Sequence, residues 1–170
     1  MSTMQPPMSA KTVYIASDHA AVGLKAHLQK ALPAWTWIDL GPATSERVDY
    51  PDFAEKVALK ISNGEALQGV LVCGSGIGMC IAANKFPHVR AAGVESLEAA
   101  KLSREHNDAN VLCLGARLTS PDLAVEIVRT WLETPFSEDS RHVNRIQKIS
   151  AIESRHVNQP VNPPVEKPLK

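Results

Sequence analysis

The sequence has no excess of charge of either sign and no long apolar run. Eighteen lysines and arginines balance eighteen aspartates and glutamates, so the basic surface of a nucleic-acid-binding protein is missing. No apolar stretch approaches the roughly 18 residues that a membrane-spanning helix needs. The N-terminal segment MSTMQPPMSAK lacks the apolar region of a secretion signal. We therefore expect a soluble globular chain that binds neither nucleic acid nor membrane.

Cysteine is scarce as well, and its number is odd. The three cysteines lie in apolar or glycine-rich segments, without the spacing of a disulfide framework or a metal site. Reduced thiols of this kind are typical of a cytoplasmic protein. At 170 residues the chain is long enough for one domain with a sizeable core.

Short β-rich runs alternate with helical patterns along most of the chain. We expect strands at 12–17, 35–39, 69–73, 89–94 and 110–115, and helices at 21–32, 51–62, 77–85, 96–106, 121–133 and 141–154. The short connections predict an open, mostly parallel α/β sheet. The domain is expected at 11–154, with flexible tails at 1–10 and at the proline-rich 155–170.

Two loops at the carboxyl ends of the expected strands carry candidate chemistry, and ligands of such sheets bind at this edge. SDHA follows the first strand, and CGSGIG follows the third. Glycines at 74, 76 and 78 would let backbone N–H groups point at one spot, and the next helix adds its positive end. We interpret the loop as an anion hole; the alternative is a tight turn that needs glycine for packing.

The CGSGIG loop differs from the common phosphate-binding motifs. It is neither G-x-G-x-x-G nor a Walker A loop, and a cysteine phosphatase would need an arginine near Met79. The adjacent helix end would favour a thiolate at Cys73, which we interpret as a base or nucleophile. Ser75 could donate a hydrogen bond to a developing oxyanion. Cys80, within a helix, and Cys113, within a strand, are interpreted as buried structural residues.

Two further segments offer polar side chains. His106 and Asn107 follow the fourth expected helix, where a surface histidine and a left-handed helix cap are the simpler interpretation. Arg141 and Arg145 lie four residues apart and therefore share one face of the last helix. They form either a solvated basic face or a pair of guanidinium groups that converge on a phosphate.

Five segments together resemble the ribose-5-phosphate isomerase B family, which also includes galactose-6-phosphate isomerases. They are SDHA, VDYPDFA, CGSGIGMCIAANK, SREHNDANVLCLGAR and RHVNRIQKISAIE, and the likeness runs from about Val13 to Glu153. It implies a Rossmann-like α/β fold with a five-stranded parallel sheet, helices on both faces and an extra C-terminal helix. It also implies a homodimer or a dimer of dimers, and aldose–ketose isomerisation of a sugar phosphate through an enediolate, with no metal or cofactor.

The substrate that this resemblance favours is ribose 5-phosphate, as in the non-oxidative branch of the pentose phosphate pathway. A six-carbon sugar phosphate, such as allose or galactose 6-phosphate, is the alternative within the same class of enzyme. A non-catalytic sugar-phosphate-binding module is an alternative outside it. A thiol-dependent phosphatase or redox protein is disfavoured, because the chain has no closing arginine and no C-x-x-C pair.

The resemblance also implies roles for individual residues. Cys73 would be the base that moves the proton between C2 and C1, Ser75 would help to hold the enediolate, and His106 would open the furanose ring. One branch of the family carries a glutamate base where this chain has Met79 and lacks the cysteine, so this chain resembles the thiolate branch. The implied substrate-binding residues are Asp18, His19, Gly74, Ser75, Gly76, Ile77, Gly78, Asn107, Arg117, Arg141 and Arg145.

These substrate-binding residues divide by function. Asp18 and Asn107 would hold sugar hydroxyls, whereas the amides from Gly74 to Gly78 would hold the enediolate. The phosphate would lie against one histidine and three arginines, which are His19, Arg117, Arg141 and Arg145.

The order of the elements separates the expected base from the expected ring opener. Cys73 ends a strand at the carboxyl edge of the sheet, whereas His106 follows a helix and precedes a strand, at the amino edge. A five-residue strand spans roughly 17 Å, so one chain has difficulty bringing the two together. We expect each active site to take Cys73 from one subunit and His106 from the other.

Overall fold

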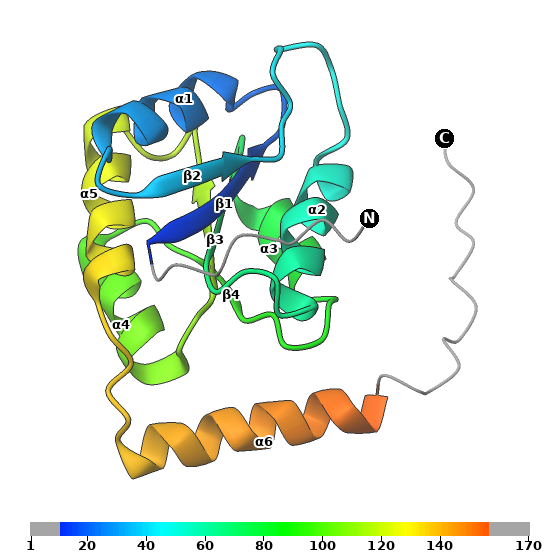
Figure 1. Cartoon of the computed structure of the whole chain (residues 1–170), viewed down its shortest axis with the longest axis vertical. Helices are drawn as coiled ribbons and strands as arrows, with labels where there is room; N and C mark the ends of the chain where they lie inside the picture. Colours follow the sequence, from blue (N-terminus) through cyan, green and yellow to red (C-terminus); the bar gives the residue numbers. More distant parts are fainter. Residues whose placement is uncertain (1–10, 157–170) are drawn as a thin grey trace, which may run out of the picture.

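Five parallel strands in the order β2-β1-β3-β5-β4 form the central sheet of the computed structural model, which describes residues 11–156 (Figure 1). The strands are β1 (Thr12–Ser17), β2 (Thr36–Asp39), β3 (Gly69–Cys73), β4 (Ala91–Gly93) and β5 (Val111–Gly115). The helices are α1 (Val22–Ala31), α2 (Tyr50–Ser62), α3 (Ile77–Ala83), α4 (Leu97–Asn107), α5 (Pro121–Glu133) and α6 (Ser140–His156). The expected parallel α/β architecture is confirmed, with element ends shifted by one or two residues.

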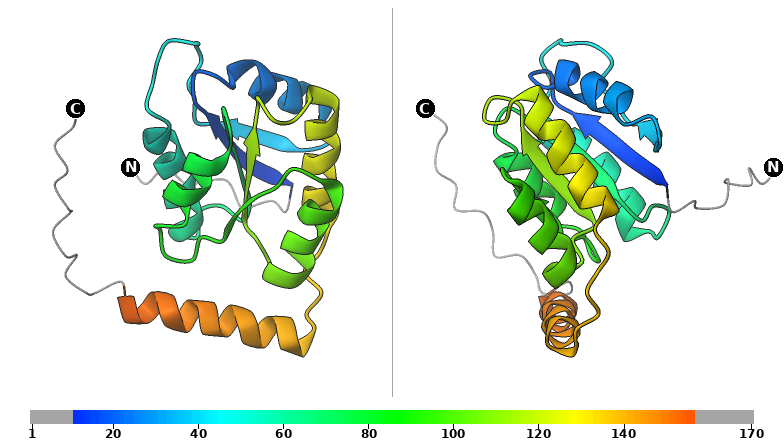
Figure 2. Two further views of the ribbon diagram at one scale, coloured as in Figure 1. Left: turned by 180° about the vertical axis from the view of Figure 1, so that it is seen from behind. Right: turned by 90° about the vertical axis from the view of Figure 1, so that its left-hand side faces the viewer.

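The two faces of the sheet are covered by different helices. Every residue of β3 and β5 is buried, which explains their uninterrupted apolar sequences, because helices cover both faces of a central parallel strand. Alternate strand side chains pack with α1 and α5 on one face and with α2 and α3 on the other. Figure 2 shows the sheet between these two layers. This arrangement leaves the carboxyl edge of the sheet open for a ligand.

Helix α6 lies along one end of the domain, apart from both layers (Figure 2). His142 is its only buried residue, and Ile149 and Ile152 remain 45% and 50% exposed. Farther along the helix, both carboxylate oxygens of Glu153 accept hydrogen bonds from the backbone N–H of His88, at 3.1 and 3.0 Å. The apolar face of α6 is therefore only partly covered by the described residues of one chain.

The last helix extends slightly beyond the end expected for it. Helix α6 continues through Arg155 and His156, whereas the domain was expected to end at 154. The first proline of the tail is Pro160, so no residue at 155 or 156 interrupts the helix. The remaining expected tail segments, 1–10 and 157–170, lie outside the described residues. Within 11–156, no helix is both long and apolar enough to span a bilayer.

Candidate active site

A pocket of about 360 Å³ opens at the carboxyl edge of the sheet. Strands β1, β3 and β5 are neighbours in the sheet, so the loops that follow them meet here although they are far apart in the sequence. The N-terminus of α2 closes one side. The residues that line the pocket are Asp18, His19, Ala20, Tyr50, Cys73, Gly74, Ser75, Gly78, Arg117 and Leu118. The structure thus brings the SDHA and CGSGIG loops together and adds Arg117 from a third loop.

Cys73 is the last residue of β3, and its side chain is 4% exposed. Its Sγ accepts a hydrogen bond from the backbone N–H of Gly76 at 3.1 Å. An N–H donor favours negative charge on the atom that accepts from it. The loop also bonds to itself at the next residue, since the N–H of Ile77 donates to Ser75 Oγ at 3.4 Å. Two of the amides proposed for an anion hole therefore bond within the loop in this structure.

Gly76 has the packing role that was the alternative interpretation of this loop. Its φ is +77°, in the left-handed region that favours glycine. A Cβ at this position would lie 2.8 Å from the backbone carbonyl carbon of Leu114. The loop after β3 therefore packs directly against the end of β5, and this close approach fixes both walls of the pocket.

The other two loop glycines make room for side chains. A Cβ on Gly74 would lie 3.3 Å from Cζ of Arg117, and a Cβ on Gly78 would lie 2.6 Å from Cζ of Tyr50. Arg117 is also held through its backbone N–H, which donates to the carbonyl of Gly74 at 3.0 Å. The glycines thus allow a guanidinium group and a phenol to lie directly over the loop that carries Cys73.

Asp18 and His19 follow β1 and have fixed orientations. Asp18 is 8% exposed, and its Oδ1 accepts a hydrogen bond from the N–H of Ala20 at 2.9 Å. The Nδ1 of His19 lies 3.2 Å from the carbonyl oxygen of Val48. The N–H of Val48 also lies 3.4 Å from Nδ1, so this nitrogen faces the backbone and Nε2 is left for a ligand.

The loop that holds His19 is itself anchored by a buried lysine. Lys25 of α1 is 3% exposed, and its Nζ lies 2.7 Å from Asp39 Oδ1 and 2.7 Å from the carbonyl oxygen of Pro42. Asp39 also accepts from the N–H of Gly41 at 2.8 Å. This network ties α1 to the segment between β2 and α2, because a buried ammonium group requires charged or polar partners.

Tyr50 was missed as a site residue by the sequence reasoning. It is the first residue of α2 and immediately precedes Pro51, which the sequence had identified as the start of that helix. A residue at this position projects from the helix N-terminus toward the carboxyl edge of the sheet. The VDYPDFA segment therefore carried the sequence signal for Tyr50, and the contact between Tyr50 and Gly78 became visible only in the structure.

The remaining expected site residues lie at the opposite, amino edge. His106 and Asn107 are the last two residues of α4, and the left-handed residue that ends this helix is Asp108, with φ +43°, rather than Asn107. Arg141 and Arg145 are exposed on the first turns of α6. This second group is separated from the pocket by the full length of β5.

The register of the sheet shows why one chain does not unite the two groups. Strands β3 and β5 pair from Gly69 with Val111 to Cys73 with Gly115, so Cys73 lies at the far end of the strands from the end of α4. Five residues of strand cover roughly 17 Å. Within one chain, the structure therefore does not bring His106, Asn107, Arg141 and Arg145 to Cys73.

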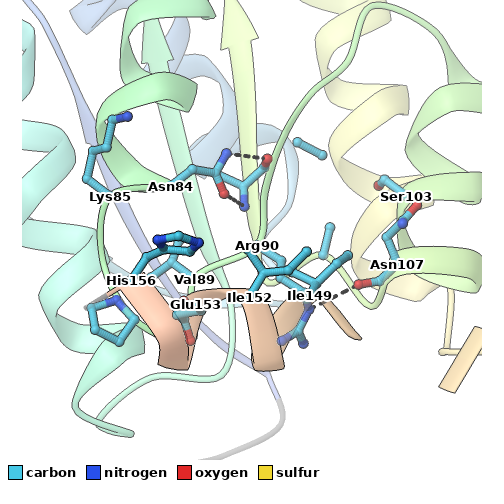
Figure 3. Close-up of a pocket in the computed structure, with 14 residues that line it drawn as sticks. Asn84, Lys85, Val89, Arg90, Ser103, Asn107, Ile149, Ile152, Glu153 and His156 are labelled. Atoms are coloured by element: carbon cyan, nitrogen blue, oxygen red, sulfur yellow. Dashed lines mark hydrogen bonds between the residues drawn. The ribbon is translucent and has the colours of Figure 1, made fainter. Parts of the chain in front are cut away.

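A larger groove, of about 560 Å³, lies between α6 and the amino edge of the sheet. Figure 3 shows Asn107 at one end of it and Ile149, Ile152 and Glu153 of α6 along its length. Across from α6, the amide side chain of Asn84 bonds to both the N–H and the carbonyl of Ala91, each at 2.9 Å. Asn84 thereby occupies the free edge of β4, where another strand would otherwise pair.

His142 is the second residue that sequence reasoning missed, although it lies within the RHVNRIQKI segment. Its ring packs against that of His106, with centroids 4.2 Å apart and planes inclined by 36°. Burial, together with the positive charges of His106 and Arg141, lowers the pKa of His142, and the carboxylate of Asp139 opposes this effect. His142 therefore favours its neutral form beside His106.

The two other cysteines differ from each other. Cys113 is buried, as expected, but Cys80 is only partly buried, which corrects its interpretation as a buried core residue. Helix α3 is short and lies beside the edge strand β4, so no further element among residues 11–156 covers Cys80 fully. A hydrogen bond with Cys113 lowers the pKa of Cys80 to about 7, and the same contact raises the pKa of Cys113 well above its usual value.

Within 11–156, no group of three or more histidine, cysteine or acidic side chains is placed to hold a metal ion. Met79, which occupies the position of the glutamate base in the other family branch, is completely buried and is part of the core beside α2.

Comparisons with known proteins agree with the geometry. The Ribose/Galactose Isomerase family matches residues 13–149. The chain is 43% identical to ribose-5-phosphate isomerase B of Escherichia coli, over 85% of this chain and 98% of that protein. It is 38% identical to D-erythrulose-4-phosphate isomerase of Pectobacterium atrosepticum, over 87% and 99%. The solved structure of type B ribose 5-phosphate isomerase from Trypanosoma cruzi superposes with a TM-score of 0.80 at 48% identity, covering 85% of this chain and 99% of that one.

Proposed function

Because the chain belongs to the Ribose/Galactose Isomerase family, we propose that it interconverts ribose 5-phosphate and ribulose 5-phosphate through an enediolate. The observation that carries the proposal is the pocket in which Cys73 lies beside Asp18, His19 and Arg117. It combines a thiol, a hydroxyl-binding carboxylate and two groups suited to a phosphate. The free state of all three cysteines supports a cytoplasmic location.

In the proposed reaction His19 and Arg117 bind the phosphate, and Asp18 holds a sugar hydroxyl. The Cys73 thiolate removes the proton from C2, so that charge develops on O1 as the enediolate forms. Ser75 and the loop amides donate hydrogen bonds to this oxyanion, which a preorganised site stabilises strongly. Cys73 then returns the proton to C1, while the O2 proton passes to O1, and the product is the ketose.

The substrate is tested by steady-state rates on four aldose phosphates: ribose 5-phosphate, allose 6-phosphate, galactose 6-phosphate and erythrose 4-phosphate. The last is included because one relative is a D-erythrulose-4-phosphate isomerase. We expect the highest kcat/KM on ribose 5-phosphate. A higher value on a six-carbon sugar would replace the proposed substrate, and no turnover of any of the four would favour a binding module.

The base is tested by Cys73→Ala, with Cys80→Ala as the matched control. Cys73 lines the pocket, whereas Cys80 does not. A general base contributes on the order of a hundredfold or more, so Cys73→Ala is expected to lose at least that much in kcat while it still binds ribose 5-phosphate in calorimetry. Cys80→Ala is expected to retain its rate. Wild-type turnover by Cys73→Ala would eliminate the thiolate mechanism.

We also propose a homodimer whose two active sites are shared, in which His106, Asn107, Arg141 and Arg145 complete the pocket of the other subunit. The support is their placement at the amino edge, away from Cys73, together with uncovered apolar side chains near both groups. Ile77, Ile81 and Leu118 are 61%, 58% and 56% exposed around the carboxyl-edge pocket. Apolar side chains gathered in this way are typical of a subunit interface.

A further inference from the structure

A buried histidine at the start of a largely exposed helix calls for a physical explanation. His142 is 3% exposed, and it is the only buried residue of α6. An aliphatic side chain would fill the same space without the cost of burying a polar ring. The partners of His142 show what the imidazole provides that an aliphatic side chain does not.

One ring nitrogen of His142 is held by a serine. Ser137 Oγ lies 2.8 Å from His142 Nδ1 and accepts a hydrogen bond from the N–H of Asp139 at 3.3 Å. With that lone pair occupied, the Ser137 hydroxyl can donate its proton to Nδ1, which is the arrangement in which the neutral ring carries its proton on Nε2. Ser137 is fixed in turn, because its own N–H donates to the carbonyl of Glu105 in α4 at 3.2 Å.

The face of the His142 ring contacts His106, the residue proposed to open the sugar ring. Their centroids are 4.2 Å apart, slightly closer than the roughly 4.5–7 Å usual for paired aromatic rings, so the two rings are in direct contact. The charged or titratable groups that act on His142 are His106 from α4, and Asp139, Arg141 and Arg145 from the α6 segment. A second positive imidazole in this setting would oppose protonation of His106.

We propose that His142 is the positioning residue for His106: a neutral imidazole, oriented by Ser137, that fixes the plane of the ring-opening histidine. The inference rests on the proposed function, since it assigns a partner to a residue of that site. Ring opening requires a proton at the ring oxygen of the sugar, and an acid rotated out of line transfers it poorly. Proton transfer by Cys73 at C1 and C2 does not depend on His142.

The two steps can be measured separately because ribulose 5-phosphate cannot form a five-membered ring, since its O5 carries the phosphate. Deuterium exchange at C1 of ribulose 5-phosphate in heavy water, followed by nuclear magnetic resonance, therefore reports the base without ring opening. Turnover of ribose 5-phosphate, which is mostly a closed furanose, reports both steps. The variants are His142→Leu, which fills the space without a nitrogen, and Ser137→Ala, which leaves the imidazole but removes its partner. Ser150→Ala, an exposed position on the same helix, is the matched control.

For His142→Leu we expect kcat on ribose 5-phosphate to fall about tenfold or more at unchanged KM, because a misplaced proton donor loses much of its effect. Exchange at C1 should stay within about threefold of wild type. Equal losses in both measurements would show a general structural role and overturn the proposal, as would no loss in either. Ser150→Ala should match wild type in both.

For Ser137→Ala we expect the acidic limb of the kcat profile to move to higher pH, because His142 then takes up a proton more readily beside His106. An unmoved limb would overturn the part assigned to Ser137, and this variant tests the proposal even if His142→Leu folds poorly. Failure of the proposed function can be told apart from failure of the role assigned to His142. In that case Cys73→Ala would retain exchange at C1, or the wild type would turn over a different aldose phosphate. In that second case the same variants are compared on the substrate that the wild type uses.

Discussion

Mixing two inactive variants tests whether the active sites are shared between subunits. Cys73→Ala lacks the base and His106→Ala lacks the ring opener. Cys73 and Gly115 pair at one edge of the sheet, and Val111, which follows α4 after a short turn, lies at the other. The separation is roughly 17 Å, too far for proton transfers to one small substrate. If a partner supplies the missing group, a mixed dimer holds one intact site of its two.

Random exchange of equal amounts makes about half of the dimers mixed, so activity should recover to about a quarter of wild type by two-fold pairing statistics. The assay is the conversion of ribose 5-phosphate after subunit exchange, with the mixed species counted by native mass spectrometry on differently tagged chains. Mixed dimers without any recovered activity would refute the shared site.

Mixing the wild type with a double variant gives a second test of the shared site, and this test starts from measurable activity. Wild type mixed with an equal amount of the double variant Cys73→Ala/His106→Ala should fall from about a half of full activity to about a quarter as subunits exchange, because each mixed dimer then lacks one group in each site. If both groups act within one chain, activity should remain at about a half. Constant activity during verified exchange would therefore contradict the geometric reasoning.

Three further outcomes follow from individual contacts. Arg141→Ala should raise KM for ribose 5-phosphate about tenfold at similar kcat, since a charged hydrogen bond is worth about 1.5–3 kcal/mol. Arg155→Ala, at the exposed end of the same helix, should leave KM unchanged. Equal effects of the two substitutions on KM would remove Arg141 from the phosphate site. Gly76→Ala should lower the free energy of unfolding in urea by about 2 kcal/mol or more, because a left-handed alanine costs about 1–2 kcal/mol and its Cβ would lie 2.8 Å from backbone. Gly23→Ala, with nothing within 4 Å in an exposed turn of α1, should be neutral or stabilising, and an equal loss there would contradict this account. The rate of Cys80 alkylation by iodoacetamide, followed by mass spectrometry, should rise with pH, because the thiolate is the reactive form. The rate should reach half its maximum near the pKa of about 7. A midpoint above pH 8 would contradict the effect assigned to the hydrogen bond with Cys113.

The alternation of strands and helices could be predicted because it follows from the local periodicity of apolar residues. The apolar runs GVLVC and VLCLG indicate strands buried on both faces, and the two expected helix starts, Pro51 and Pro121, lie in the first turn of α2 and α5. Parallel strands joined by helices leave every strand-to-helix loop at one edge. The sequence by itself therefore placed Cys73 and Asp18 at the same edge and His106 at the other.

The tertiary structure decided which of these loops touch and what each polar atom bonds to. Strand order made β1, β3 and β5 neighbours and so brought Arg117 to the thiol pocket, and the N-terminus of α2 added Tyr50. Packing between the segments also directed the Gly76 N–H at the Cys73 sulfur and placed His142 against His106. Periodicity records that a residue is buried but not which distant residue buries it, because that depends on packing between segments separated along the chain. For the same reason, only the structure showed that residues 11–156 leave part of the apolar face of α6 uncovered.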